Sequence, residues 1–457
     1  MKVIQDPPLL STSDVEAFQA DPLGQLAVAR ASLGDVFVVR KPGNVFSGAA
    51  DCSATVAVFG ASHIQRVLND AELFAMPRSS STRLALPPRL AQLNRSLHSM
   101  HEPQHNVHKR ALSYLLGRTM VEPAAAREVL QACAQNWPAR EPQPLLERMR
   151  ELSLCLAAQV LLGPLADPAL ADMLQAYFAL RRRAASPLAD DAAVLRERLL
   201  ASGRALDRTL RKHLRSAATG SALRQLLDPT RTAGIALSEG EAAGHANILF
   251  VSATEPVAVA LTWALLLLSQ QPDWRRLARE DSEALDDVLL ESLRLLPPNA
   301  FMARLTTQTV QLAGVQLPAN CELILCPFLA HREPAVFERP RTFLPRRWRR
   351  FHPRPYEFLP FGAGRHACVG RGMAMELLRS VLGFAVRNFD VVLDGDQAID
   401  WRMHVQFMPR EDIRVRFEPA GSIFHGGRWR GPVAQLVELE DPPPTPYECA
   451  ELGRFAP

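Results

Sequence analysis

The sequence lacks the features that mark several common classes of protein. Its seven cysteines are dispersed, odd in number and free of any CxxC pair, which argues against a disulfide framework or a zinc site. No apolar run near the N-terminus resembles a signal peptide, and the most apolar stretch, Val257–Leu268, is too short to span a bilayer. These absences predict a cytoplasmic protein in a reducing compartment, without a membrane anchor.

Composition and charge indicate one globular body. The 457 residues are 47% hydrophobic and 22% charged, and the net charge of +4 does not suggest a nucleic-acid partner. Neither repeats nor a clear linker divide the chain, so we expect a single large domain over residues 1–419. Residues 420–457 are rich in Gly and Pro with little apolar periodicity, which predicts a poorly ordered tail.

The apolar pattern predicts a mostly helical protein with a small β-rich part, an α+β class. Val- and Phe-rich segments within 35–60 indicate strands, whereas helical periodicity dominates residues 62–295. Short strands return after residue 300, and a strand pair is expected over 402–417. Both ends of the chain therefore contribute to the β-rich part.

The most informative segment is FLPFGAGRHACVGRGMAMELL, residues 358–378, in which glycines surround Cys368 and an amphipathic helix follows. Glycine allows a backbone to approach a flat surface, and the free N–H groups of a helix N-terminus favour a thiolate. A thiolate held by N–H donors beside a flat surface is what a cysteine-ligated haem requires. Taken alone, the loop also fits a buried structural cysteine in a glycine turn.

Five residues of this loop, Phe361, Gly364, His366, Cys368 and Gly370, resemble the haem-binding signature of the cytochrome P450 family. The resemblance implies haem b as cofactor, with Cys368 as the metal ligand. It also implies that Phe361 packs near the sulfur and that His366 meets a haem propionate.

A second motif supports the resemblance. Glu291 and Arg294 lie three residues apart among leucines, so we expect a buried pair that needs a further hydrogen-bond donor. Arg347, in FERPRTFLPRRW, resembles the family's arginine that completes a Glu-Arg-Arg cluster. The likeness covers residues 285–388 and, more weakly, 30–418, and implies a cytochrome P450-like fold.

Three further residues resemble the family's contacts with the haem propionates: Arg304, His105 and Lys109. Lys109 stands where the family usually has an arginine. Because lysine lacks the bidentate fork of a guanidinium, a solvated helix lysine is the alternative interpretation.

A long apolar helix is expected after Ser238, which forms a capping box with Glu241. It resembles the P450 helix that crosses the distal face of the haem. In that register Glu255 keeps the family's acid, but Pro256 replaces the threonine that steers protons toward bound oxygen. Interior proline costs about 3 kcal/mol, so this departure is not a neutral change.

Proline frees the carbonyl four residues earlier, which belongs to Ser252. We therefore assign the catalytic role to Ser252, Glu255 and Pro256, with Ser252 and a bound water replacing the threonine as proton relay. Thr254 lies about 200° round the helix from Pro256 and is expected to point away. A proline here is also similar to the peroxide-using fatty-acid P450s, although Glu255 would repel a carboxylate.

Seven arginines crowd into a short segment before the cysteine loop: 339, 341, 346, 347, 349, 350 and 354. Such a basic face would steer an acidic electron donor of the ferredoxin type. A run of solvated arginines is the alternative.

The resemblance also implies a set of substrate contacts: Val251, Asn299, Ala300, Phe301, Met302 and Phe407. This apolar lining favours a medium-sized, largely hydrophobic substrate, free or presented by a carrier protein. The leading interpretation is an oxygen- and ferredoxin-dependent monooxygenase of secondary metabolism. Non-standard chemistry on the same fold (peroxygenase, oxidative coupling, dehydrogenation or rearrangement) and a non-catalytic haem-binding protein are the alternatives.

Overall fold

The fold was analysed in a computed structural model of the chain. It describes residues 7–10, 18, 21–45, 51–77, 86–97, 100, 102–138, 141–164, 168–184, 192–216, 221–403, 406–422 and 426–440.

The α-helices are α2 (Pro22–Leu33), α3 (Ala61–Asn69), α4 (Pro88–Leu93), α5 (Gln104–Leu116), α6 (Pro123–Ala134), α7 (Leu145–Ala157), α8 (Pro168–Ala184), α9 (Ala192–Arg215), α10 (Glu239–Gln270), α11 (Pro272–Glu280), α12 (Ser282–Leu295), α13 (Pro327–Ala330), α14 (Arg371–Asn388) and α15 (Pro432–Leu436). The strands are β1 (Val36–Arg40), β2 (Ala54–Val58), β3 (Phe74–Ala75), β4 (Gln143–Pro144), β5 (Met302–Thr306), β6 (Val310–Leu312), β7 (Val315–Leu317), β8 (Cys321–Leu325), β9 (Thr342–Phe343), β10 (Phe389–Leu393), β11 (Gln397–Ala398), β12 (Trp401–Met403), β13 (Phe407–Pro409), β14 (Arg414–Pro419), β15 (Trp429–Arg430) and β16 (Glu438–Leu439).

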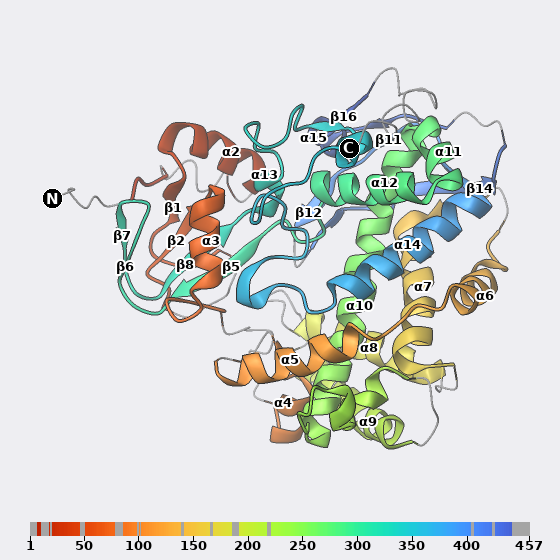
Figure 1. The fold of residues 1–457 in the computed structure, drawn as a ribbon, viewed down its shortest axis with the longest axis horizontal. Helices are drawn as coiled ribbons and strands as arrows, with labels where there is room; N and C mark the ends of the chain where they lie inside the picture. Colours follow the sequence, from red (N-terminus) through yellow and green to blue (C-terminus); the bar gives the residue numbers. More distant parts are fainter. Residues whose placement is uncertain are drawn as a thin grey trace.

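The main sheet joins the two ends of the chain, as the sequence predicted. Its order is β1-β2-β8-β5-β3, and β2 runs parallel to β8, with Val56 opposite Leu323. In Figure 1 this sheet lies at one side of the molecule with α2, α3 and α13, while most of the other helices lie around α10. The predicted α+β class is confirmed.

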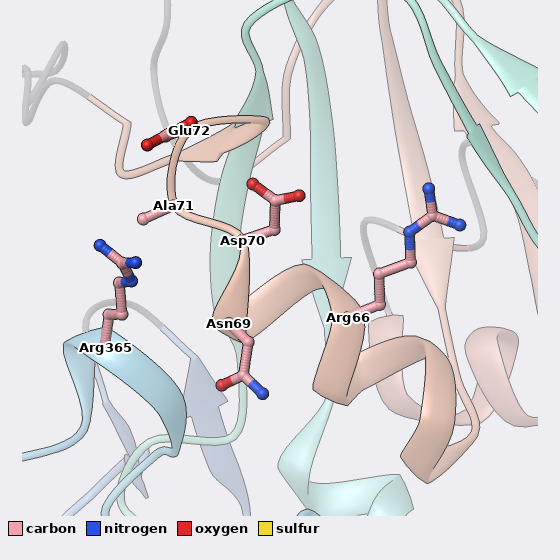
Figure 2. Close-up of a pocket in the computed structure, with 6 residues that line it drawn as sticks. All are labelled: Arg66, Asn69, Asp70, Ala71, Glu72 and Arg365. Carbon is pink, nitrogen blue, oxygen red and sulfur yellow. The ribbon is translucent and has the colours of Figure 1, made fainter.

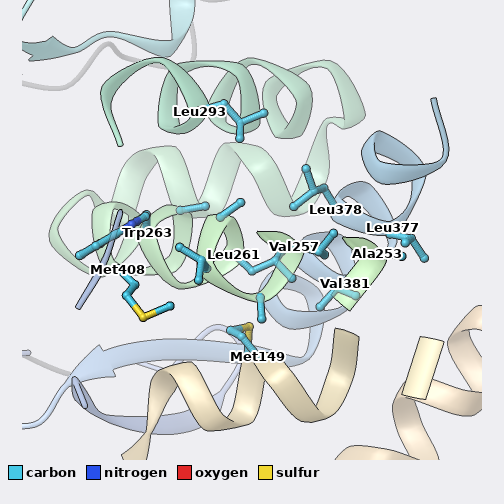
Figure 3. Packing of buried hydrophobic residues seen from close by; sticks show 14 of the residues in the cluster. Met149, Ala253, Val257, Leu261, Trp263, Leu293, Leu377, Leu378, Val381 and Met408 are labelled. Carbon is cyan, nitrogen blue, oxygen red and sulfur yellow. The ribbon is translucent and has the colours of Figure 1, made fainter. Parts of the chain in front are cut away.

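Helix α10 forms the centre of the helical body. The predicted capping box is present, because the Ser238 side chain accepts from the Glu241 backbone N–H while the Glu241 side chain accepts from the Ser238 N–H. Figure 3 shows side chains of α7, α12 and α14, among them Met149, Leu293 and Val381, packed around this helix. Although α10 has the length and apolar composition of a membrane span, its most apolar part is buried in the fold.

A buried carboxylate joins α12 to the coil that precedes the cysteine loop. Glu291 accepts from Arg294 Nε at 2.9 Å and Nη2 at 2.8 Å, and from Arg347 Nε at 3.2 Å. The Leu344 backbone N–H and the Trp348 indole complete the set, at 2.9 and 3.0 Å. Both Glu291 and Arg294 have 0% of their side chains exposed, so the charges compensate each other inside the protein.

The C-terminal segment differs from the sequence expectation. Over residues 426–440 the chain is ordered, because β15 pairs with β11, β16 pairs with β9, and Trp429, Val433 and Val437 are buried. Glu440 also forms ion pairs with Arg339 and Arg346. The sequence did not predict this order because residues 426–440 show little apolar periodicity. Three buried apolar side chains are enough to hold the segment when β11 and β9 are available for pairing. Residues 441–457 lie outside the described part of the chain.

Replacing Glu291 with Gln leaves two buried arginines without their counter-charge. We expect a loss of about 3–5 kcal/mol in the free energy of unfolding, followed by circular dichroism during urea titration. Glu283→Gln on the same helix is the matched control, because Glu283 is 76% exposed beside Arg349 and its loss should cost less than about 1 kcal/mol. Equal effects of the two variants would contradict the assigned role.

Replacing Val433 with Asp places a charge where the side chain is 0% exposed, and should lower the melting temperature by several degrees. Gln435→Asp, at an exposed position of α15, is the control and should have little effect. Differential scanning calorimetry makes the comparison. An unchanged melting temperature in Val433→Asp would show that residues 426–440 contribute nothing to the fold.

Candidate active site around Cys368

Backbone hydrogen bonds shape the loop that carries Cys368. The Cys368 N–H donates to the Phe361 carbonyl at 2.8 Å, and Gly362 and Gly364 have φ values of 64° and 68°. A Cβ atom at Gly364 would lie 2.4 Å from the Leu68 carbonyl oxygen, so only glycine fits between this loop and α3. Gly370 is the N-cap of α14, which places Cys368 just before that helix.

The Cys368 sulfur is accessible, yet protein atoms surround it. Its side chain is exposed, while burial raises the pKa of the thiol against the opposing effects of the Gly370 N–H and the charges of Lys109 and Arg371. An exposed side chain with protein atoms around it leaves the sulfur accessible to a ligand. Since burial disfavours the free thiolate, a bound metal ion is what would hold the sulfur deprotonated.

Two of the basic residues predicted to meet propionates, His105 and Lys109, lie beside this loop. The rings of His105 and His366 lie 4.1 Å apart between centroids, and Lys109 Nζ donates to the Arg365 carbonyl. Arg304 is 4% exposed and forms no ion pair with a described residue, and burial lowers its pKa to about 10. A buried cation without a carboxylate partner favours binding of an anionic group.

His331 is a positioning residue that the sequence analysis missed. It is 0% exposed, its Nδ1 lies 3.2 Å from the Arg294 carbonyl, and its Nε2 accepts from the Leu359 N–H at 2.7 Å. Burial lowers its pKa to about 3, so the ring is neutral. The Glu291 cluster is thereby joined to the start of the cysteine loop. A single histidine in a coil gives no periodic signal that would predict this contact.

One strip of α10 is accessible although the helix is enclosed. Between Ala242 and Leu268 the residues that are not buried are Ile248, Leu249, Ser252, Glu255 and Pro256. At 100° per residue they fall within about 120° of one face. Accessible side chains in the middle of an enclosed helix border an internal space.

On the opposite face, Thr254 Oγ1 accepts from Gln175 Nε2 of α8 at 2.8 Å and donates to the Val251 carbonyl at 3.1 Å. Thr254 is thus turned away from the strip that contains Ser252.

Glu255 lies at the edge of the strip and binds an arginine that the sequence did not point to. Arg150 of α7 donates to Glu255 Oε2 through Nε at 3.0 Å and to Oε1 through Nη2 at 2.5 Å. Arg150 also contacts Glu147 at 2.6 Å. Its signal in the sequence was weak, because an arginine on an amphipathic helix usually faces solvent.

The predicted substrate residues lie in different surroundings. Asn299 is exposed, Phe301 and Met302 are half-buried, and Val251 and Ala300 are buried. A Cβ atom at Gly362 would lie 3.6 Å from Met302 Sδ, so this segment lies against the cysteine loop.

Phe407 is 0% exposed and packs against Trp263, Phe328 and Trp401 at centroid distances of 5.3–5.5 Å. We therefore expect Phe407 to support the wall of the site rather than to touch a ligand.

Most of the arginine-rich segment is paired with acids, and of its seven arginines Arg350 and Arg354 are exposed without an ion pair to a described residue. Arg347 is internal, Arg339 and Arg346 pair with Glu440, and Arg341 pairs with Glu438. Arg349 pairs with three acids of the α12 region: Asp281, Glu283 and Asp287. These acids come from distant parts of the sequence. Counting the arginines in residues 339–354 alone therefore overestimated the unpaired positive charge of the segment.

A separate cavity of about 380 Å³ lies between the segment at the end of α3 and Arg365 of the cysteine loop. Figure 2 shows its lining, formed by Arg66, Asn69, Asp70, Ala71 and Glu72 together with Arg365. It opens on the surface and does not include Cys368, so it is distinct from the internal space.

Comparison with known proteins agrees with this geometry. The family model described as "Cytochrome P450" matches residues 204–413. A putative cytochrome P450 137 of Mycobacterium tuberculosis is 28% identical over 322 residues, which are 64% of this chain and 65% of that protein. Cyclooctatin synthase of Streptomyces melanosporofaciens is 34% identical over 157 residues, 30% of this chain and 34% of that enzyme. The match to the mycobacterial relative thus spans a little under two thirds of that protein.

Solved structures share the whole architecture. CYP175A1 from Thermus thermophilus superimposes with a TM-score of 0.69 and 25% identity, covering 90% of this chain and 100% of that one. The retinoic acid-bound cyanobacterial CYP120A1 superimposes with a TM-score of 0.71 and 20% identity, covering 91% and 99%.

Proteins of this family hold a haem b through a cysteine thiolate, and the residues present fit that group. Cys368 offers an accessible sulfur in an enclosed space, and Arg304 is a buried cation without a described carboxylate partner. The family model, the mycobacterial relative, the shared fold and the cysteine loop together support the interpretation of the chain as a bacterial cytochrome P450.

Proposed function

We propose that this protein is a haem-thiolate monooxygenase that acts on a medium-sized, largely hydrophobic substrate. The observation that carries the proposal is the enclosed but accessible Cys368 sulfur, in a protein whose central helix presents an accessible strip. Cys368 would bind the iron of haem b, and Arg304, His105, His366 and Lys109 would hold its propionates. The bound haem supplies the redox centre at which dioxygen is reduced.

Within this site, Ser252 takes the role of proton donor. Its hydroxyl lies on the accessible strip, on the same face as Pro256 one turn later, and the ring of Pro256 cannot donate a hydrogen bond. A water held between the Ser252 hydroxyl and its carbonyl would carry protons into the pocket. Arg150 holds Glu255 at the edge of the strip, so Glu255 would position the groups through which protons enter this path.

The names of relatives support an apolar substrate and a place in secondary metabolism. CYP120A1 was solved with retinoic acid, and another relative is a cyclooctatin synthase. The accessible residues Ile248, Leu249 and Phe301 are apolar, and the strip's one acid is neutralised by Arg150. We infer a largely hydrophobic substrate, free or carried by a protein.

A ferredoxin-type donor suits the surface near the cysteine loop. Arg110, Arg118 and Arg371 are exposed and form no ion pair with a described residue. Arg110 follows Lys109, whose side chain reaches the loop at Arg365, and Arg371 begins α14. These three arginines would steer an acidic partner toward Cys368. A cytoplasmic location agrees with the six free thiols of the described residues.

Pro256 favours a second candidate function, non-standard chemistry driven by peroxide, because the usual threonine hydroxyl is missing. The two functions differ in their oxidant. We expect reduced ferredoxin and dioxygen to support substrate oxidation, and peroxide alone to support little.

The test begins with a titration of the ferric holoprotein against apolar metabolites, retinoic acid included, in which a low-spin to high-spin shift identifies a ligand. Product formation from that ligand is then measured with each oxidant. Equal or faster turnover with peroxide alone would replace the monooxygenase by a peroxygenase, and no turnover with either would remove both.

Substituting Ser252 with Ala should break the proposed proton relay. We expect product per electron pair to fall by about tenfold, with peroxide released instead, since a positioned acid contributes about 10²–10⁴-fold. Thr254→Ala, on the buried opposite face, is the control and should leave coupling unchanged. Coupled turnover is measured as product formed per NAD(P)H consumed in the reconstituted system. Unchanged coupling in Ser252→Ala would reject the relay.

A further inference from the structure

Two cysteines outside the active site face each other between α6 and α7. Cys133 lies in the last turn of α6 and Cys155 near the end of α7, and their sulfurs are 2.8 Å apart. A disulfide bond is about 2.05 Å long, so a shift of less than about 1 Å would join them. Both side chains are half-buried, so small solutes can reach them.

A hydrogen bond between the two sulfurs couples the ionisation of the pair. The hydrogen bond with Cys133 lowers the pKa of Cys155 and raises that of Cys133, so the proton stays on one sulfur while the other gains thiolate character. Burial and the nearby Glu151 oppose this effect at Cys155. A thiolate next to a second thiol is the arrangement in which oxidation leads to a disulfide.

The other described cysteines lack these properties. Cys52, Cys321 and Cys326 are buried, and burial raises the pKa of Cys321 and of Cys326 to about 12. Cys368 belongs to the haem site. Within the described residues, Cys133 and Cys155 are therefore the thiols that are both reachable and paired outside the active site.

We propose that Cys133 and Cys155 form an oxidation-sensitive dithiol that hydrogen peroxide converts to a disulfide joining α6 to α7. The thiolate of one of the two cysteines attacks one peroxide oxygen, which gives a sulfenic acid and, after protonation, releases water. The sulfur of the other cysteine then attacks the sulfenic sulfur, forming the S–S bond and releasing a second water. Two thiols and one peroxide thus yield one disulfide and two waters.

The cross-link would act on a helix that contacts the active site. It closes a chain segment of 22 residues that includes β4, which pairs with β14. Helix α7 packs on α10, and its Arg150 holds Glu255. A disulfide would therefore attach α7 to α6, while Arg150 on the same helix α7 positions Glu255. This inference does not depend on the substrate or electron donor proposed above.

The test uses the haem-loaded full chain carrying Cys449→Ser, which removes a thiol outside the described residues. The reduced protein is treated with a slight excess of peroxide, alkylated with N-ethylmaleimide and analysed by peptide mass spectrometry. We expect a peptide pair linked through Cys133 and Cys155, lighter by two hydrogen atoms and restored to two alkylated thiols by dithiothreitol. The melting temperature should rise by roughly 2–6 °C on oxidation.

Cys133→Ser and Cys155→Ser are matched controls, and each should abolish both the linked peptide and the rise in melting temperature. Cys52→Ser should abolish neither. The proposal is overturned if oxidised protein keeps both thiols alkylatable, if a different pair is linked, or if Cys155 stops at an over-oxidised acid. Because the linked peptide and its reversal are measured without altering either cysteine, a poorly folded variant does not affect the result.

Discussion

The buried carboxylate of Glu291 is the interaction on which the rest of the site depends. It binds two arginines, an indole N–H and a backbone N–H, and so fastens the coil after β9 to α12. An ionised carboxylate without water is tolerated only with such complete compensation. Through Arg294 and the neutral His331 the same cluster reaches the Leu359 N–H, where the cysteine loop begins. The compensation of the Glu291 charge is thus linked, through Arg294 and His331, to the position of the loop that carries Cys368.

The cysteine loop combines a tight backbone with a thiol whose ionisation is disfavoured by burial. Gly364 allows the loop to lie against α3, and the Cys368 N–H is taken up by Phe361, so the backbone is settled without a cofactor. The sulfur is different, because burial raises the pKa of the thiol although the Gly370 N–H and the charges of Lys109 and Arg371 oppose this. Arg304 shows the same imbalance with opposite charge. A bound haem b would compensate both, because its iron can bind the Cys368 sulfur and its propionates can pair with Arg304.

The long helix α10 shows how one residue changes the chemistry available to a conserved architecture. Its accessible strip holds Ser252 and Pro256, while Thr254 is used for packing against α8. Glu255 is bound by Arg150 rather than free in the pocket. The proton path that we propose therefore uses the Ser252 hydroxyl and an acid that is already paired. Because α7 supplies the arginine, helices remote from the haem loop influence this path.

The sequence alone determined the class of fold, the capping of α10 and the motifs around Cys368 and Glu291, because periodicity, caps and close-spaced motifs are local properties of the chain. It also indicated from the angle round a helix that Thr254 faces away from Pro256. Only the tertiary structure decided which charges remain free. The arginines at 339, 341, 346 and 349 are paired with acids far along the chain, Arg150 finds Glu255 across two helices, and residues 426–440 become ordered against β9 and β11. Ion pairs and strand pairs between residues far apart in the sequence depend on how the helices and strands pack. No local sequence pattern predicts them.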